Sequence, residues 1–300
     1  MRKLMRGCTF PEPYFCSVPF LNKGTGEEEI HDFPVFLPHE ALRWYIQNND
    51  NRMALWAAKP EHSIFGEARA WCDKFEVDLM KFIPLGVHGD GVPFASKMRD
   101  SLECISYNII TDLSGVRILY TTFPKSWSAG KNTWDVLFRV FAWSMRHLMM
   151  GCCPRMREDG GAWKSSDDAR ANASGKALGF HAAVLQIRGD WAFYKEVFAF
   201  PHWKAKQCCW KCFAKNSPGE VGDFRDATAN APWRNMRISG HDFMRLQMAE
   251  GDNTIFLVFM PWHDSGHGDG GLVAHDGPGC AGRCDWQCVL GCVAFAQGPT

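Results

Sequence analysis

Two stretches decide the fold: FIPLGVHGD at residues 82–90 and HAAVLQIRGD at residues 181–190. Each is an apolar run long enough for a buried strand, and each ends in an aspartate that follows a glycine. A single glycine-flanked aspartate is often an ordinary turn residue. Because Asp90 and Asp190 end two separate predicted strands, a second interpretation arises, in which the two carboxylates meet in the folded protein.

The residues between these stretches predict the rest of a sheet. SLECISYNIITD (101–112) is rich in β-branched residues and predicts a second strand, and SGVRILYTTF (114–123) predicts a third. The short gap at residues 113–115 favours an antiparallel hairpin between them. Three strands therefore follow one another before the next helix.

Two helices complete the predicted order of elements. Residues 132–151 form an amphipathic pattern whose first turn Asn132 or Thr133 can cap, and residues 191–200 look helical before Pro201. The apolar face of the first helix consists of Leu137, Phe141, Met145 and Leu148. The order strand, strand, strand, helix, strand, helix is that of an α/β, ribonuclease-H-like mixed sheet. In that order the ends of the first and fourth strands are neighbours.

A pair of carboxylates at adjacent strand ends favours one kind of chemistry. Two negative charges repel unless cations lie between them, and Mg²⁺ or Mn²⁺ prefers carboxylate oxygens. Two such ions can activate a water and stabilise the leaving oxygen in phosphodiester cleavage. The sequence therefore predicts Asp90 and Asp190 as catalytic metal ligands, whereas His88 and Arg188 receive no role.

The motifs GVHGDGVPF and RGDW, followed by a histidine and a CxxC pair, resemble the catalytic core of a known enzyme family. They are similar to DDE-type transposases of the CACTA (En/Spm) kind and to their relatives in transposon-derived reading frames of protists such as dinoflagellates. The resemblance covers about residues 80–215. It implies DNA strand cleavage and transfer, with Asp90 and Asp190 as the first two acids of a metal-binding triad and a zinc-binding insertion around Cys209 and Cys212.

The resemblance weakens after about residue 215. A DDE enzyme carries its third carboxylate on a later helix, and the sequence contains no recognisable helix of that kind. Glu250, at the end of a short predicted helix from about residue 240, is the one conceivable substitute. We therefore expect a truncated and inactive remnant as readily as an active enzyme.

The stretch PHWKAKQCCWKCFAKN contains candidate zinc ligands. Cys209 and Cys212 at CxxC spacing can hold one Zn²⁺ in a tight turn, and His202 or Cys208 could supply a third ligand. In the resembling enzymes a distant histidine pair can complete such a site, which makes His241 the nearby candidate for the fourth ligand. We predict a zinc knuckle that includes His202, Cys209 and Cys212; the alternative is a buried thiol and an inert loop.

The same stretch is basic and aromatic and contains no acid. Lysines can displace counterions from phosphates, and an indole face can stack on unpaired bases. The stretch is thus the predicted DNA-contact patch, although a solvated lysine face over core tryptophans is the alternative. Its predicted contact residues are Lys204, Lys206, Trp210, Lys211 and Lys215.

The remaining sequence divides by composition. The prolines and the acidic run near the N-terminus predict an irregular arm over residues 1–40. Apolar residues spaced three and four positions apart predict a helical lead-in over residues 41–80. The predicted core spans 81–215 and has a partial continuation over 216–250. The glycine- and cysteine-rich residues 251–300 are expected to be a disordered or non-native tail.

Composition and charge set limits on partners and compartment. The 33 basic residues balance the 33 acidic ones, so attraction to DNA must come from a local patch. Charges interrupt the apolar helix at 132–151 and prolines interrupt the basic N-terminus, so we expect neither a membrane span nor a secretory signal. Thirteen cysteines, an odd number, then fit a reducing compartment, the nucleus or the cytoplasm.

Three classes of function stay open at this point. The first is a metal-dependent transposase core that acts on DNA, with self-association as a further partner interaction. The second is a non-catalytic, zinc-stabilised nucleic-acid-binding domain derived from such a core. The third is a structural protein whose cysteines and aromatic residues simply pack.

Overall fold

The computed structural model describes residues 10–49, 56–93, 100–198, 204–206 and 214–234. It divides into two compact units, the first ending its sheet at Gly189 and the second beginning at Asp190. The elements in chain order are β1 (Tyr14–Leu21), β2 (Glu28–Val35), α1 (Pro38–Gln47), α3 (Phe65–Phe75), η1 (Leu79–Lys81), β3 (Phe82–Pro93), β4 (Ser101–Ile109), β5 (Ile118–Pro124), η3 (Lys125–Trp127), α4 (Lys131–Met150), η4 (Ser165–Asp167), α5 (Asp168–Ala173), β6 (His181–Gly189), α6 (Trp191–Phe198) and η5 (Pro232–Arg234).

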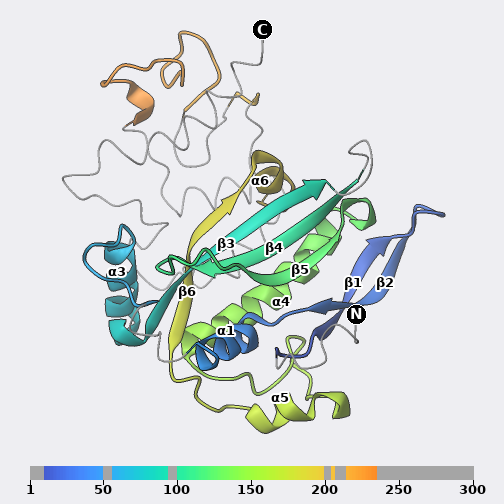
Figure 1. Ribbon diagram of the computed structural model, residues 1–300. Helices are drawn as coiled ribbons and strands as arrows, with labels where there is room; N and C mark the ends of the chain where they lie inside the picture. Colours follow the sequence, from blue (N-terminus) through green and yellow to red (C-terminus); the bar gives the residue numbers. More distant parts are fainter. Residues whose placement is uncertain (1–9, 50–55, 94–99, 199–203, 207–213, 235–300) are drawn as a thin grey trace. The chain divides into compact units, whose positions relative to one another are not determined.

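The first unit is a mixed α/β structure built around a four-stranded sheet in the order β5-β4-β3-β6 (Figure 1). Strand β4 is antiparallel to both β3 and β5, whereas β6 is parallel to β3. The four predicted strands, the long helix between the third and the fourth, and the antiparallel hairpin are therefore confirmed. The predicted end of the first strand at Asp90 is wrong, because β3 stays paired with β4 and continues to Pro93. The hairpin connection is longer than predicted, because β4 ends at Ile109 and β5 begins only at Ile118.

Helix α4 covers one face of this sheet and contributes much of the core. The predicted apolar stripe is confirmed, since Leu137, Phe141, Met145 and Leu148 are all buried. Tyr120 of β5 packs its ring against Phe141 and donates its hydroxyl to the Leu137 carbonyl at 2.6 Å. These contacts join the helix to the centre of the sheet.

The predicted cap of α4 is wrong. The helix begins at Lys131 with Gly130 at the N-cap position, and no side chain caps it there. Thr133 is fully buried, accepts the Ala129 N–H and donates to the Pro19 carbonyl at 2.5 Å. Its hydroxyl is therefore used to bind β1 to the start of the helix, a contact between segments that a local sequence pattern does not reveal.

Helix α3 packs against the beginning of β3 and β6. The Trp71 indole stacks on the Phe82 ring with centroids 4.5 Å apart, and Ala68, Cys72 and Ala183 join the same buried cluster. The helical lead-in predicted for residues 41–80 is present as α1, α3 and the short η1.

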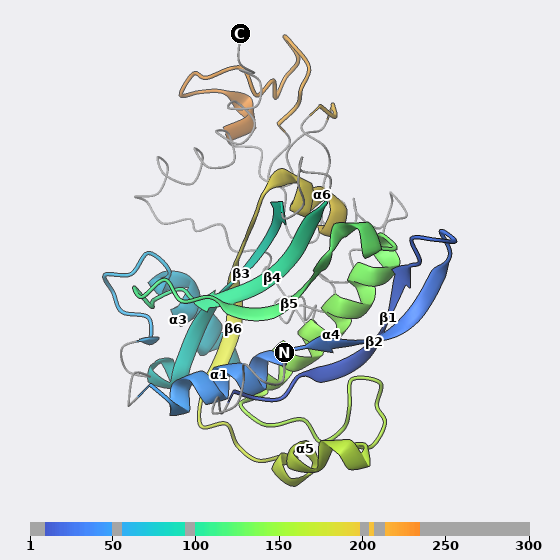
Figure 2. The same ribbon diagram turned by 45° about the vertical axis from the view of Figure 1, so that its right-hand side comes forward.

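The irregular arm predicted for residues 1–40 is wrong from Tyr14 onward. Strands β1 and β2 form an antiparallel hairpin beside α4 (Figure 2). Tyr14, Cys16 and Val18 are buried at alternate positions of β1. The prolines did not prevent pairing, because a two-stranded ribbon has free edges on which a missing N–H costs little.

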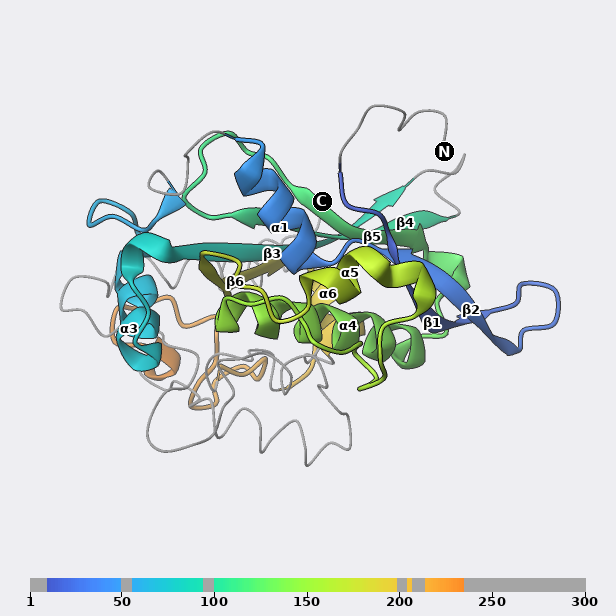
Figure 3. The ribbon, with the colours of Figure 1, turned by 90° about the horizontal axis from the view of Figure 1, so that it is seen from below.

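Most residues of the segment between α4 and β6 are exposed. It contains η4 and the short helix α5 (Figure 3), and Arg170 of α5 pairs with Glu40 of α1. Across the described residues, no helix has both the length and the apolar character needed to cross a membrane.

Candidate functional site

The predicted carboxylate site lies at the end of the parallel strand pair. His88 is the register partner of Arg188, and Gly89 is the partner of Gly189. Asp90 continues β3 as an exposed residue opposite Cys104 of β4. Asp190 belongs to the second unit, so its proximity to Asp90 stays a prediction.

Asp190 has a visible structural role. Its Oδ1 accepts the Phe193 N–H at 2.7 Å, and its carbonyl accepts the Tyr194 N–H at 3.2 Å at the start of α6. This is the bonding of a helix N-cap, in which a carboxylate satisfies an N–H that the helix leaves unpaired. The cap uses one oxygen of the carboxylate, so the other can still accept a bond or bind a cation.

A polar pair lies next to Asp90 on the same face of the sheet, because residues i and i+2 of a strand point the same way. His88 Nε2 lies 2.7 Å from Asn108 Oδ1, and Asn108 Nδ2 donates to the Ile109 carbonyl at 3.1 Å. The amide must therefore turn its oxygen to the imidazole, so Nε2 carries the proton of the neutral ring. Gly86 leaves room for this amide, since a Cβ there would lie 2.8 Å from Asn108 Oδ1.

The electrostatics of this face favour a neutral histidine and a protonated thiol. Burial lowers the pKa of His88, the hydrogen bond to Asn108 opposes that effect, and the charges of Arg117 and Arg188 lower the pKa further. Burial raises the pKa of the Cys104 thiol, and the Asp90 carboxylate raises it again. The sequence alone did not identify Asn108 and Cys104, because their positions near His88 and Asp90 depend on the register between β3 and β4.

Several predicted residues lie outside the described residues: His202, Cys209, Trp210, Lys211, Cys212, His241 and Glu250. The zinc knuckle and the third acid thus stay predictions. Within the described part of the chain, no three histidine, cysteine, aspartate or glutamate side chains come together as a metal-binding group.

Two of the three described lysines of the predicted DNA-contact patch pair with an acid. Lys206 Nζ lies 2.9 Å from Glu220 Oε1, and Lys215 Nζ lies 3.7 Å from Glu220 Oε2. The hydrogen bond with Lys206 lowers the pKa of Glu220, so the glutamate is ionised at neutral pH. The patch is therefore less basic than its sequence suggests, because the fold adds an acid from outside the stretch.

The first unit also contains a pocket that the sequence did not predict. Its volume is about 330 Å³, near the lower end of the range for small-molecule sites. Side chains from α1, from the segment after α4 and from α5 line it, among them Arg43, Trp44, Cys153 and Trp163. Because these positions are far apart in the sequence, no local motif marks the pocket.

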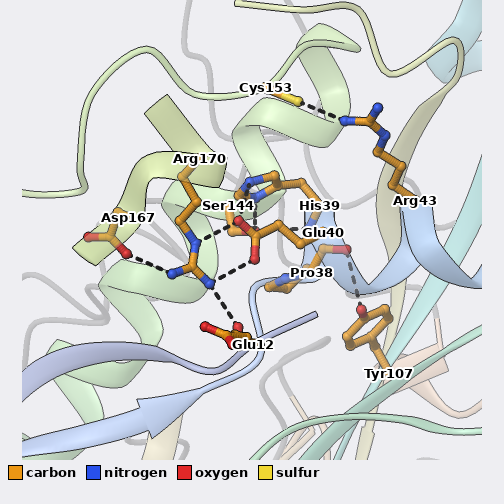
Figure 4. Close-up of polar contacts among 10 residues, drawn as sticks. All are labelled: Glu12, Pro38, His39, Glu40, Arg43, Tyr107, Ser144, Cys153, Asp167 and Arg170. Carbon is orange, nitrogen blue, oxygen red and sulfur yellow. Dashed lines mark hydrogen bonds and ion pairs between the residues drawn. The ribbon is translucent and has the colours of Figure 1, made fainter. Parts of the chain in front are cut away.

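Arg170 lines this pocket and bonds to residues of several segments of the chain (Figure 4). Its guanidinium makes a bidentate pair with Glu40 at 2.8 and 2.9 Å, a bond to Asp167 at 2.8 Å and a bond to the Glu12 carbonyl at 2.8 Å. The Arg170 side chain is only 13% exposed. One arginine thus connects the N-terminal segment, α1 and α5.

His39 and Ser144 form a buried pair behind Glu40 (Figure 4). Ser144 Oγ accepts the His39 backbone N–H at 3.1 Å and lies 2.8 Å from His39 Nδ1. Burial above all, together with the charges of His147, Arg170 and Arg43, lowers the pKa of His39 to about 3. Because Ser144 is completely buried, this histidine–serine pair serves packing and is no accessible nucleophile.

Comparison with known proteins gives no relative: no protein-family model, no curated protein and no solved structure matches this chain.

Proposed function

We propose that this protein cleaves and transfers DNA strands in the manner of a DDE-type transposase with a ribonuclease-H-like core. Asp90 and Asp190 would be the ligands of Mg²⁺ or Mn²⁺, and the protein would work on DNA in the nucleus. The observation that supports this proposal is the parallel register of β3 and β6. It brings Gly89 beside Gly189; Asp90 is the next residue of β3, and Asp190 directly follows the last residue of β6.

The donor chemistry fits a hard divalent cation. Asp90 and Asp190 are exposed and offer carboxylate oxygens, the ligands that Mg²⁺ prefers. Asp190 commits one oxygen to the cap of α6, which would hold the other in a fixed direction. A bound metal would supply an activated water and stabilise the leaving oxygen of the phosphodiester. The role of the two residues would be to hold and orient the cation.

Nicking of a supercoiled plasmid in the presence of Mn²⁺ tests the proposal. Asp90→Asn keeps the size of an exposed side chain and removes its charge, so we expect a folded protein that no longer nicks. Asp73→Asn, at an exposed position of α3, is the matched control and should nick like the parent protein. Equal nicking by the parent and Asp90→Asn would contradict the assignment of Asp90.

A second candidate is the non-catalytic, zinc-stabilised DNA-binding domain. The observation in its favour is the cap formed by Asp190, because this bond explains the aspartate without any metal. In this case the protein would bind DNA and lose affinity steeply with salt, through lysines such as Lys204 and Lys206. Binding without metal-dependent nicking in the parent protein would favour this candidate over the enzyme.

A further inference from the structure

The four-stranded sheet has a second face, which points away from α4. Tyr107 and Tyr120 pack their rings against Phe141 of α4, so their side chains mark the face that the helix covers. Neighbouring residues of a strand point to opposite faces. Ser106 and Asn108, on either side of Tyr107, therefore point away from α4. We call the surface that contains Ser106, Asn108 and their register partners the outer face.

One row of register partners crosses the outer face from β6 to β5. Arg188 of β6 is the partner of His88, which in turn is the partner of Ser106 of β4. Ser106 is also the partner of Leu119 of β5, and side chains opposite each other in a ladder share a face. Arg117 stands two positions before Leu119, so it follows the same side of the chain into β5. An arginine therefore lies at each end of the row.

The electrostatics of the outer face agree with this placement. Burial is the main cause that lowers the pKa of His88, and the charges of Arg117 and Arg188 lower it too. Burial and the Asp90 carboxylate raise the pKa of the Cys104 thiol, whereas the charge of Arg117 lowers it. The field of both guanidiniums thus acts over the outer face, close to Asp90.

The two arginines are available to a ligand. Both are exposed, and within the described ranges neither guanidinium forms an ion pair with an acid. Arg188 Nη2 donates to Gln186 Oε1 at 2.7 Å, a neutral acceptor that orients the guanidinium and leaves its charge unbalanced. Lys206 and Lys215 of the predicted DNA-contact patch, in contrast, share the carboxylate of Glu220.

The charge of the outer face suits a phosphodiester backbone. Its described part has the guanidiniums of Arg117 and Arg188 against one carboxylate, that of Asp90. A guanidinium matches the oxygens of a phosphate with two parallel hydrogen bonds. Asp90 stands two positions beyond His88, which is about 7 Å along β3 at the usual rise of a strand. A phosphate held between the arginines would therefore lie beside the proposed metal ligand.

We propose that one DNA strand lies across the outer face, with backbone phosphates paired to Arg117 and Arg188, and that this contact brings the strand to Asp90. The inference rests on the proposed DNA-cleaving function and names the surface that holds its substrate. The two arginines position the strand and take no part in the cleavage itself. Phosphate contacts fix the place of a protein on DNA without reading bases, so this binding has little preference for sequence.

Binding of a fluorescently labelled single-stranded DNA to the full chain, measured by anisotropy without added divalent cations, tests the contact in the absence of cleavage. Arg117→Gln and Arg188→Gln should each weaken binding about fivefold or more, because a charge-assisted hydrogen bond is lost. Each should also reduce the slope of log affinity against log salt by about 0.7, the share of one phosphate on a single strand.

Arg139→Gln is the matched control. Arg139 is an exposed arginine of α4, the helix on the other face of the sheet, and its substitution removes the same charge. This variant should bind DNA like the parent protein. Arg117→Lys keeps the charge and should retain the salt dependence, while it loses part of the affinity because an ammonium makes no bidentate contact.

Equal affinity of the parent protein and both glutamine variants, an equal loss in Arg139→Gln, or no DNA binding by the parent protein would each overturn the inference. The nicking assay tests the proposed function separately. Nicking by the parent protein with DNA binding unchanged in Arg117→Gln and Arg188→Gln would overturn this inference alone. Arginine-dependent binding without nicking would support it and contradict only the proposed cleavage.

Discussion

Gly89 of β3 and Gly189 of β6 are side-by-side partners in a parallel ladder, although β4, β5 and α4 lie between them in the chain. This register places the last residue of β6 beside Gly89, from which β3 continues to Pro93, and an aspartate follows each glycine.

Asp190 should tolerate asparagine better than alanine in a stability measurement. Both side chains can accept the Phe193 N–H, whereas alanine leaves it unpaired, so Asp190→Ala should weaken α6 by about 1 kcal/mol. Hydrogen exchange at the Phe193 amide measures the effect, and it should be faster in Asp190→Ala than in Asp190→Asn. If the enzyme proposal holds, both variants lose nicking, because both lose the charge.

Gly86 should not accept a side chain. In Gly86→Ala the new Cβ would lie 2.8 Å from Asn108 Oδ1, so the amide must move and its bond to His88 is lost. We expect a loss of about 1–3 kcal/mol in the free energy of unfolding, measured in urea. Gly91→Ala on the same strand is the matched control, since its nearest neighbour is 3.7 Å away. Similar stability of the two variants would contradict this packing.

Arg170→Ala should lower the free energy of unfolding more than substitution of an exposed, ion-paired arginine does. It leaves Glu40 and Asp167 without their partner in a largely buried position, which costs about 3–5 kcal/mol when such a pair is broken. Arg170→Lys should lose less, because it keeps the charge but not the bidentate geometry. The exposed pair of Arg69 and Asp73 gives the comparison: Arg69→Ala should change the free energy of unfolding by less than about 1 kcal/mol.

His39 should make the protein less stable in acid. Its pKa falls from 6.5 to about 3 on folding, so between these values the unfolded chain holds a proton that the folded protein does not. Stability is fully present above pH 6.5 and is lost as the pH falls through this window, by about 1.4 kcal/mol per pH unit from this group. Urea unfolding at pH 7 and pH 5 should show a smaller difference for His39→Gln than for the parent protein. An unchanged difference would argue against a neutral, buried His39.

The purified protein should contain one zinc ion per chain if the predicted knuckle forms. Cys209→Ser and Cys212→Ser should each lose the metal, measured by elemental analysis. Cys152→Ser, at a partly buried position of the first unit, should keep it. Equal zinc content in all variants, or no zinc in the parent protein, would remove the knuckle from both functional candidates.

The sequence predicted the sheet better than it predicted the segments packed around it. Runs of apolar and β-branched residues predicted the buried strands, and the apolar stripe from Leu137 to Leu148 predicted the buried face of α4. Both patterns depend only on residues that are neighbours in the sequence. The β1–β2 hairpin was missed, because prolines and an acidic run normally indicate irregular structure. The role of Thr133 was missed because its partner, the Pro19 carbonyl, belongs to a distant segment.

By itself, the sequence determined the four strands of the sheet, helix α4 and their order, and it showed that an aspartate follows a glycine in β3 and directly after β6. These are local properties, since each depends on the spacing of neighbouring residues. Only the tertiary structure decided that Asn108 fixes the His88 ring, that Glu220 pairs with two lysines of the basic stretch, and that Arg43 and Trp163 share a pocket. Such contacts join residues far apart in the chain, and register and packing, which no local pattern contains, bring them together.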